Sequence, residues 1–376
     1  MKNKQKSIVL LVVMVFALAL PRMKNVDADS LTIIETYSTS EYDKFGFASS
    51  ENWNRYSGNP ILTAGRGDWD EGFLVKPSVI YRNDKYWLYY YGQAYPGNPP
   101  RSIGLATSTD GYDFIKEASN PILSPDPGQW DKRDVFEPAI LFHKGEYWLY
   151  YAGAQVVGGT MRVGLAKSTD GVNFIRITNG INGTSKVLEE GEANEWDENG
   201  VHPCSVIYRK REFKLYYWSY WSTPTHVAIG LATSTNGVNF TRITDGLDGT
   251  SKVLREEGES WEDAGPFRGS VFYYKGKYRM YYSGTTATPV LRKDIGYAES
   301  DDGKNWTRAP SNPVMLIGTA AWENDYLVAC SFIWKNGNAK NKGLVYYQGA
   351  YISYPLPTNR IGLFEQFRKA SIDDVN

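Results

Sequence analysis

Charged residues of different kinds stand at matching places along this sequence. The stretch DVFEPAILFHKGEYWLYYAG (134–153) has three close relatives elsewhere in the chain, and where it carries Glu137, two of them carry Lys76 and Arg268. In the third relative, His202 stands one step before the same place. A carboxylate, two cations and an imidazole can exchange protons or bind a polar ligand, and they are costly to bury unless they pair or meet a ligand. These positions are therefore the first candidates for chemistry.

The matching places belong to a unit that is repeated five times. A tryptophan followed by an acidic residue recurs every 61 to 66 residues, at Trp69, Trp130, Trp196, Trp261 and Trp322. An apolar run, a short polar turn, a Tyr-rich run and further strand-like segments follow each tryptophan. These runs are rich in β-branched and aromatic residues and lack helical periodicity, which predicts a four-stranded antiparallel sheet per unit. Five such sheets around one axis form an all-β, five-bladed β-propeller.

The two ends of the repeat region are predicted to complete one blade. The fifth unit stops before its fourth strand, and the missing segment has a counterpart near the N-terminus, because ENWNRYSGNPIL (51–62) matches YDFIKEASNPIL (112–123). An N-terminal strand in the last blade would close the ring and protect its open edges. We therefore expect a single propeller domain over residues 29–376.

Comparison among the repeats separates expected scaffold from candidate site. Features present in every unit, such as the acid after each tryptophan and the STDG turns, are assigned to structure. Seven residues after each tryptophan, the units differ, carrying Lys76, Glu137, Pro203, Arg268 and Ala329. This is the start of the innermost strand, where side chains from all blades converge. A polar binding pocket is the favoured interpretation, and a structural ion-pair ring that plugs the channel is the alternative.

Long loops on the same face of the ring offer further candidates. They join the second and third strands of each blade, and loops over a rigid scaffold are where binding sites are commonly built. For stacking on a sugar they supply Tyr95, Trp221, Tyr351 and Tyr354. As hydrogen-bond donors they supply Arg101, Arg162, His226, Arg292 and Arg360.

Composition limits the class of partner. The 376 residues carry a formal net charge of −1, which gives no indication of a nucleic acid or an anionic membrane as partner. Aromatic residues make up 15% of the chain, as suits both packed β cores and sugar binding. We expect a monomer that binds carbohydrate. The two cysteines, Cys204 and Cys330, lie in apolar runs and are expected to be buried free thiols. No cofactor or firm metal site is predicted, and a calcium or sodium ion in the channel stays open.

The N-terminus has the pattern of an export signal. A basic segment, MKNKQK, precedes the apolar run SIVLLVVMVFALAL, and Val26 and Ala28 occupy small-residue positions of a cleavage site. The apolar run is short for a membrane span. We predict that residues 1–28 are a removed signal peptide and that the protein is secreted or periplasmic. A retained membrane anchor is the alternative.

The chain resembles the five-bladed glycosidase propellers over about residues 50–367. This group contains the arabinanases and xylosidases of glycoside hydrolase family 43, the invertase and levanase group of family 32, and the mannoside phosphorylases and hydrolases of family 130. The resemblance rests on NPIL before the tryptophan, on a charged residue before Pro-Ser or Pro-Ala in the inner strand, and on YWLYYYG followed by IGLATSTDGYDF. It implies that carboxylates at the inner-strand starts protonate the leaving oxygen and activate water or attack the sugar.

Carried over by position, the resemblance implies that Glu137 is the general acid, with a pKa raised by partial burial. The pattern departs elsewhere, because Lys76 stands where an aspartate is expected and the third unit offers His202 in place of a glutamate. Asp134 and Glu71 are the candidates for a water-activating base. Lys76 and Arg268 would suit an anionic group such as a uronate, a sulfate or a phosphate.

The leading hypothesis is an exported glycoside hydrolase that cleaves a polysaccharide or oligosaccharide, with acidic sugars as one option. A phosphorylase and a polysaccharide lyase on the same scaffold are enzymatic alternatives. The non-enzymatic alternative is a carbohydrate-binding propeller without turnover, which the missing acids favour.

Overall fold

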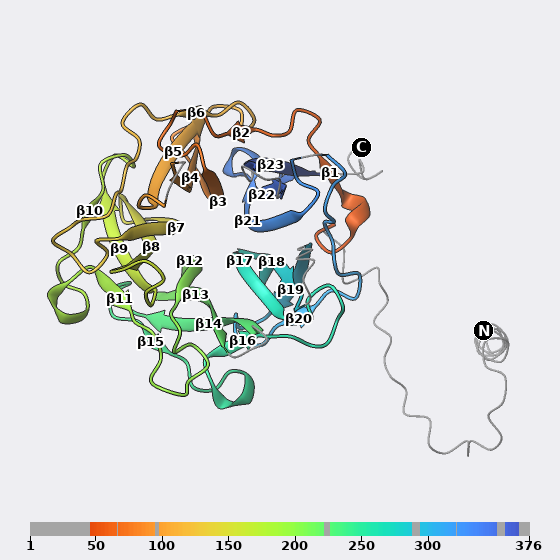
Figure 1. The fold of residues 1–376 in the computed structure, drawn as a ribbon. Coiled ribbons are helices and arrows are strands. Elements are labelled where there is room, and N and C mark those ends of the chain that lie inside the picture. The colour runs from red at the N-terminus through yellow and green to blue at the C-terminus, as the bar shows by residue number, and fades with distance from the viewer. Residues whose placement is uncertain are drawn as a thin grey trace, which may run out of the picture. The chain divides into compact units, whose positions relative to one another are not determined.

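The computed structural model describes residues 46–65, 67–94, 98–221, 226–287, 294–320, 322–351 and 358–367. In that part of the chain, five antiparallel sheets surround a common centre (Figure 1), which confirms the predicted five-bladed propeller. The predicted signal peptide and the candidates Tyr95, Tyr354 and Arg292 lie outside the described residues, as does the side chain of Tyr351.

In each of the first four blades, the first four strands follow chain order from the centre outward. The fifth strand of blades 2 and 3 pairs with the third strand of its blade. Blade 1 contains β3 (Phe73–Arg82), β4 (Lys85–Gln93), β5 (Ser102–Ser108) and β6 (Ile115–Lys116). Blade 2 contains β7 (Asp134–His143), β8 (Glu146–Ala154), β9 (Arg162–Ser168), β10 (Ile175–Arg176) and β11 (Lys186–Leu188). Blade 3 contains β12 (His202–Arg209), β13 (Glu212–Trp221), β14 (His226–Ser234), β15 (Thr241–Arg242) and β16 (Lys252–Leu254). Blade 4 contains β17 (Gly265–Tyr274), β18 (Lys277–Thr285), β19 (Ile295–Ser300) and β20 (Thr307–Arg308).

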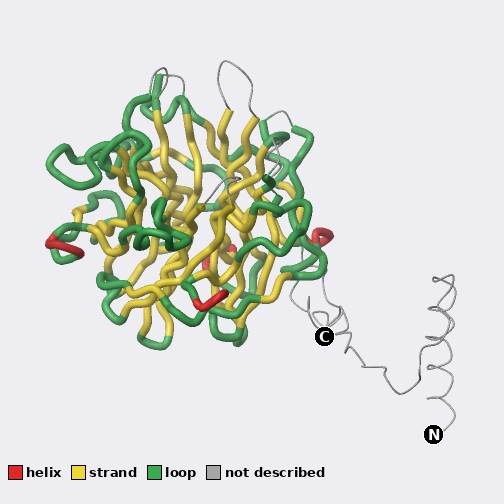
Figure 2. The backbone as a smooth tube through the Cα atoms, turned by 60° about the horizontal axis from the view of Figure 1, so that its bottom comes forward, coloured by secondary structure: helices red, strands yellow, loops and turns green. Residues whose placement is uncertain are grey.

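Blade 5 combines both ends of the described chain. Its strands are β21 (Tyr326–Trp334), β22 (Gly343–Tyr351), β23 (Thr358–Gln366), β1 (Trp53–Arg55) and β2 (Leu62–Thr63). Strand β1 pairs antiparallel with β23, with Trp53 opposite Gln366. The short 3-10 helices of the described residues are η2 (Ser50–Asn52), η3 (Ile181–Gly183), η4 (Leu247–Gly249) and η5 (Lys335–Gly337). Figure 2 shows the long strands running between faces that carry the loops.

Tyrosine hydroxyls link each blade to the next. A tyrosine of the second strand donates to the backbone carbonyl of a glycine in the turn after the neighbouring blade's third strand. The pairs are Tyr89 with Gly171 (2.9 Å), Tyr150 with Gly237 (2.8 Å), Tyr216 with Gly303 (2.7 Å) and Tyr346 with Gly111 (2.9 Å). These glycines have positive φ, as at Gly111 (φ 85°), and an added Cβ there would meet the ring of Tyr86 and the hydroxyl of Tyr346. The repeated STDG turns therefore have the structural role predicted for them.

A ring of serine hydroxyls joins the inner strands at the centre. Each serine accepts a hydrogen bond from a backbone N–H of the next blade's inner strand. The pairs are Ser78 with Ile140 (3.1 Å), Ser205 with Val271 (3.1 Å), Ser270 with Phe332 (3.0 Å) and Ser331 with Val79 (2.9 Å). Blade 2 carries Ala139 at this position, and alanine has no hydroxyl to offer to blade 3.

The acid after each repeated tryptophan is a buried structural residue. Each one lies within ion-pair distance of a cation on the outermost strand of its own blade. The pairs are Asp70 with Lys116, Asp131 with Arg176, Asp197 with Arg242, Glu262 with Arg308 and Glu323 with Arg55, at 2.7 to 2.9 Å. This confirms the structural assignment made from the repeats. In blade 5 the cation comes from β1, so the N-terminal strand supplies what the C-terminal strands lack.

The two cysteines are buried and not bonded to each other, as expected. Burial raises the pKa of each thiol to about 12, so both stay protonated at neutral pH. Within the described ranges, no helix is both long enough and apolar enough to span a bilayer.

Phe47 fastens the N-terminal segment between blades 4 and 5. Its side chain is 2% exposed, and its ring lies 5.5 Å from Phe272 and 5.6 Å from Trp334. Its carbonyl accepts the hydroxyl of Tyr281 (3.1 Å), in the place that a turn glycine fills between the other blades. The segment before β1 therefore substitutes for a missing piece of the repeat.

Replacing Phe47 by alanine should lower the free energy of unfolding by about 3–5 kcal/mol, because the change leaves a cavity at the junction of two blades. Urea denaturation followed by fluorescence measures the change. Ile115→Ala, at a side chain that is 76% exposed, is the matched control and should change stability by less than about 0.5 kcal/mol. Equal effects of the two substitutions would contradict this role for Phe47.

Candidate functional site

A bulge in the inner strand positions each of the three charged candidates. In β3, β7 and β17, strand pairing jumps across Lys76, Glu137 and Arg268, so that two residues face one on the neighbouring strand. The three residues have φ values of 50°, 52° and 48°, in a region that residues other than glycine rarely adopt. Bulges turn a side chain out of the regular alternation, and backbone strain of this kind clusters at functional sites.

Glu137 is the centre of a cluster built from three blades. Its carboxylate is fully buried, and Oε1 accepts a hydrogen bond from Nη2 of Arg268 at 2.5 Å. Nε1 of Trp218 donates to Oε2 at 2.8 Å. Nδ1 of His202 lies 3.3 Å from the same oxygen, within ion-pair reach although the angle does not make a hydrogen bond. We call Glu137, His202, Trp218 and Arg268 the central cluster.

The charges around Glu137 keep it ionised. Burial alone would raise the pKa of this carboxyl, but the guanidinium of Arg268, followed by His202 and Lys76, outweighs burial and holds the pKa well below its ordinary value of 4.5. A general acid must carry a proton at the working pH, and the pKa of Glu137 is shifted in the opposite direction. The expected raised pKa is therefore wrong, and Glu137 in this arrangement acts as an acceptor and anchor.

His202 is the group of the central cluster best able to transfer a proton. Its ring stacks on Trp218 with centroids 4.0 Å apart and planes at 18°. Burial lowers the pKa of His202, although the charge of Glu137 counteracts this, so the imidazole is mainly neutral at pH 7. Nδ1 faces Glu137, and Nε2 has no hydrogen-bond partner among the described residues. A neutral imidazole with a free nitrogen can accept a proton.

Arg268 connects the central cluster to the second strands of two other blades. Its guanidinium lies 4.5 Å from the ring centroid of Phe267, and it makes long contacts of 3.5 Å to the hydroxyl of Tyr91 and 3.4 Å to Gln348. Its Nε is buried without a hydrogen-bond partner among the residues described. Arg268 therefore keeps some donor capacity beyond its bond to Glu137.

Tyr91, Trp218 and Gln348 are residues of the candidate functional site that were not among the candidates predicted from the sequence. In each blade, one tyrosine of the second strand packs against the repeated tryptophan, and each of these three residues comes directly after that tyrosine. The repeats contain a signal for this position, since the residue there varies. The residue at this place differs in every unit, being Tyr91, Ala152, Trp218, Ser283 and Gln348. The comparison that singled out the inner strand would have found this second variable column.

Lys76 does not stand open to a ligand. Its Nζ donates to the backbone carbonyls of Pro138 (2.9 Å) and Pro203 (2.7 Å), and its side chain is 3% exposed. Burial lowers the pKa of Lys76 to about 8, although Glu137 opposes the shift. Lys76 thus connects blades 2 and 3 through its ammonium group, and its predicted anion-binding role stays a prediction.

The two candidate bases, Asp134 and Glu71, lie apart from the central cluster. Asp134 is nearly fully buried and is bound by two arginines, Arg101 at 2.9 Å and Arg133 at 2.8 Å. Glu71 accepts a backbone hydrogen bond from Gly67 at 3.0 Å within its own loop. Neither contacts Glu137, so their predicted roles as the base are not supported by this geometry.

The loop candidates are divided among other places. Arg162 is bound to Glu190 through Nε at 2.6 Å. Trp221 stacks on His226, with centroids 5.7 Å apart and planes at 24°, and it meets Trp196 edge to face at 6.0 Å. Arg162 begins β9 of blade 2, whereas Trp221 ends β13 and His226 begins β14 in blade 3. None of the three has a contact with Glu137 among the described residues. Their predicted role in binding substrate stays a prediction.

No group of three or more His, Cys, Asp or Glu side chains in the described ranges is arranged to hold a metal ion. A cavity of about 190 Å³ lies among the inner strands, lined in part by Ser78, Cys204, Ser270 and Cys330. Its polar lining consists mainly of the serine hydroxyls and backbone groups that hold the blades together.

Comparison with known proteins identifies the fold. No family model matches the sequence, and no curated protein matches it. Solved structures do: a glycosyl hydrolase from Bacteroides ovatus is 16% identical with a TM-score of 0.63, covering 83% of this chain and 92% of that one. A thermostable family-43 glycoside hydrolase is 16% identical with a TM-score of 0.58, covering 80% and 91%. Zg3597, a family 117 glycoside hydrolase of Zobellia galactanivorans, is 19% identical with a TM-score of 0.57, covering 84% and 90%. The chain thus has the propeller fold found in glycoside hydrolases.

Separate replacement of Glu137 by leucine and of Arg268 by methionine should each cost about 3–5 kcal/mol of unfolding free energy, because each leaves a buried charge unpaired. The double variant should be more stable than either single one. Urea denaturation of the four proteins measures the coupling.

The exposed pair Lys277 and Asp301 (2.9 Å) is the control for this cycle, and its coupling should stay below about 1 kcal/mol. Losses that simply add in the Glu137–Arg268 cycle would show that the two charges do not stabilise each other.

Acid should weaken the contribution of Glu137. Because its pKa in the folded state lies below the ordinary value of 4.5, its ionised form stabilises the fold above that value and the stabilisation is lost as the pH falls. The difference in unfolding free energy between the wild type and Glu137→Gln should therefore shrink from about pH 5 to about pH 3. Denaturation curves at several pH values measure it, and a constant difference would contradict an ionised Glu137.

Proposed function

We propose that this chain is a glycoside hydrolase that binds a polysaccharide or oligosaccharide over the central cluster. One observation carries the proposal: Glu137, His202 and Arg268, which are unlike groups from three blades, meet at the starts of the inner strands. Aromatic rings of Tyr91 and Phe267 adjoin them, and such rings suit sugar faces. The propeller fold that this chain shares with the solved glycoside hydrolases named above supports this class of activity.

The residue geometry suggests a division of roles that differs from the one implied by the resemblance. His202 acts as the base that takes a proton, through Nε2, from the attacking water, while the C–O bond to the leaving sugar breaks and its oxygen takes a proton from solvent. The carboxylate of Glu137, with Oε2 3.3 Å from Nδ1, stabilises the protonated form of the imidazole by its negative charge. Arg268 keeps Glu137 ionised and offers its remaining N–H groups to a sugar hydroxyl.

The charge balance favours a neutral sugar over an acidic one. Arg268 is neutralised by Glu137, and the ammonium of Lys76 is turned toward two backbone carbonyls. A uronate or sulfate would find little free positive charge among these residues. Acidic sugars, considered from the sequence, are therefore not part of the proposal.

Export and a monomeric state complete the proposal as predictions from the sequence. Residues 1–28 carry the features of a signal peptide, and a secreted or periplasmic enzyme would meet polysaccharides outside the cell.

A carbohydrate-binding propeller without turnover is the second candidate. The specific observation in its favour is that the carboxylates nearest the inner-strand starts, Glu137 and Asp134, are both bound by arginines. A glycosidase normally needs two carboxyl groups that can act on the substrate. This candidate predicts sugar binding with no released product.

A screen of plant and algal polysaccharides for released reducing sugar tests the proposal. On a substrate that the wild type cleaves, His202→Gln should lower kcat by about 100-fold or more, the usual contribution of a general base. His143→Gln is the matched control, because His143 lies at the far end of β7 among aromatic rings and should leave kcat unchanged.

Full activity of His202→Gln would overturn the assignment of the base. Binding of a polysaccharide with no product from any of them would favour the second candidate. Products that absorb in the ultraviolet would indicate a lyase instead.

A further inference from the structure

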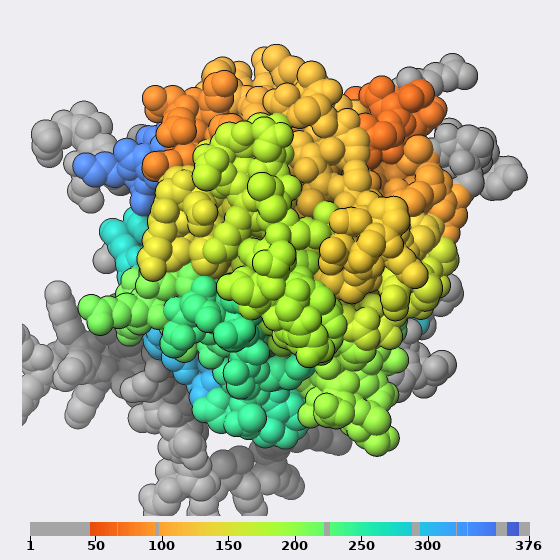
Figure 3. Space-filling model, turned by 90° about the vertical axis from the view of Figure 1, so that its left-hand side faces the viewer, coloured from red at the N-terminus to blue at the C-terminus, as the bar shows by residue number. Residues whose placement is uncertain are grey.

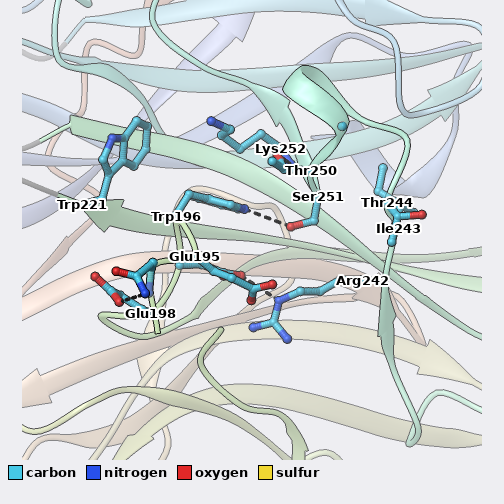
Figure 4. A pocket seen from close by; sticks show the side chains of 13 residues that line it. Glu195, Trp196, Glu198, Trp221, Arg242, Ile243, Thr244, Thr250, Ser251 and Lys252 are labelled. Carbon is cyan, nitrogen blue, oxygen red and sulfur yellow. Dashed lines mark hydrogen bonds and ion pairs between the residues drawn. The ribbon is translucent and has the colours of Figure 1, made fainter. Parts of the chain in front are cut away.

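A second pocket lies in blade 3, away from the contacts of Glu137. Blades 2 and 3 form the side of the ring that faces the viewer in Figure 3, coloured from yellow to green. The pocket has a volume of about 630 Å³, within the usual range for small-molecule sites. It lies between the loop 194–198, the end of β13 and the outer segments 242–244 and 249–252 (Figure 4). We call it the blade 3 pocket.

Two tryptophans form rigid walls of the blade 3 pocket. Trp196 is held by a hydrogen bond from Nε1 to Oγ of Ser251 (3.0 Å) and by stacking on Tyr217 (5.6 Å, 20°). Trp221 is backed by His226 and stands nearly perpendicular to Trp196, at 88°. Both indoles are only partly buried, so they present fixed apolar surface beside solvent, as saccharide sites require.

Polar groups converge beside these walls. Glu195 and Glu198 each use Oε2 to accept a backbone N–H, from Glu192 (2.9 Å) and Asn194 (2.6 Å). Their Oε1 atoms have no partner in the described part of the chain. The ammonium of Lys252 lies 5.2 Å from the indole of Trp221 on the opposite side of the pocket. Free carboxylate oxygens next to indole rings can accept hydrogen bonds from sugar hydroxyls while a ring stacks on the sugar face.

The repeats show that these groups are not needed for the fold. Blade 2 has the same framework, in which Trp130 donates to Ser185 at 2.9 Å as Trp196 does to Ser251. Counting from these tryptophans, blade 2 has Gln155 in place of Trp221, Gln129 in place of Glu195 and Lys132 in place of Glu198. Since the framework is kept without them, the groups particular to blade 3 point to a ligand.

We propose that the blade 3 pocket is a second saccharide-binding site, which holds a neutral sugar unit of a polysaccharide by stacking on Trp221. It is separate from the central cluster because alternate residues of a strand point to opposite sides, and Trp218 and Trp221 are three residues apart on β13. Trp218 contacts Glu137, whereas Trp221 contacts Trp196. The inference rests on the proposed function for the class of ligand and is independent of turnover.

Affinity electrophoresis in gels that contain arabinan, xylan, laminarin or agarose tests the proposal. Trp221→Ala should be retarded less than the wild type, with an apparent Kd for the polysaccharide at least about fivefold higher, because the sugar can no longer stack on an aromatic ring. Trp221→Tyr, which keeps an aromatic ring, should retain more of the retardation. Gln155→Ala, at the equivalent place in blade 2, should behave as the wild type does.

Thermal unfolding of each variant checks that the fold is intact. The proposal is overturned if the wild type and Trp221→Ala are retarded equally. It is also overturned if Gln155→Ala loses as much retardation as Trp221→Ala does, or if none of the four polysaccharides retards the wild type. Hydrolysis of a short oligosaccharide by the wild type and by each variant is measured in parallel with the electrophoresis. If the wild type hydrolyses a substrate and Trp221→Ala leaves the retardation unchanged, only this inference is refuted. If Trp221→Ala weakens the retardation but no substrate is hydrolysed, only the proposed function is refuted.

Discussion

Closure of the ring is the constraint on which the rest of the structure depends. Five sheets of about the same size can close around one axis only if each contacts its neighbour in the same way, and here a tyrosine hydroxyl bound to a turn carbonyl repeats that contact. Between blades 4 and 5 the carbonyl comes from Phe47, and the cation for Glu323 comes from Arg55. The N-terminal segment thus reproduces repeated interactions with residues from outside the repeat.

Closure also forces the inner strands to share a narrow space. Side chains at the starts of these strands converge whatever their charge. The bulges at Lys76, Glu137 and Arg268 turn charged groups into the shared space. In low dielectric surroundings an unpaired charge is far more costly than a paired one. Glu137 is therefore ionised and held by Arg268, and His202 is left as the titratable group with a free nitrogen. The chemistry of the centre follows from how these charges neutralise one another.

Much of the fold was predictable from the sequence, because repetition provides five independent examples of each contact. The blades, the buried acids such as Asp131, and the two free thiols followed from residue patterns. The site was predictable only in part. The repeats indicated Glu137, His202 and Arg268, but the sign of the pKa shift of Glu137 depends on distances between blades that no sequence pattern contains.

Other predicted site residues lie away from Glu137 for identifiable physical reasons. Asp134 has the residue type of a base, yet Arg101 and Arg133 flank it once the strands are paired. Trp221 was predicted to stack on a sugar from a loop at one face of the ring. The alternation along β13 turns it toward Trp196, whereas Trp218, three positions earlier, contacts Glu137. The alternation of side chains along β13, in which one residue changes the face, decided the place of Trp221.

The alanine at position 139 affects which mutations the protein can tolerate during evolution. It leaves the junction of blades 2 and 3 without the serine bond that four other junctions possess, and the ammonium of Lys76 spans this same junction by binding Pro138 and Pro203. Glu137 and Trp218 cross it too. Lys76, Glu137 and Trp218 thus hold together the junction of blades 2 and 3, so mutations that alter ligand preference there would also affect the stability of the ring. Ligand preference would therefore diverge more easily through changes in the outer loops than through changes in the central cluster.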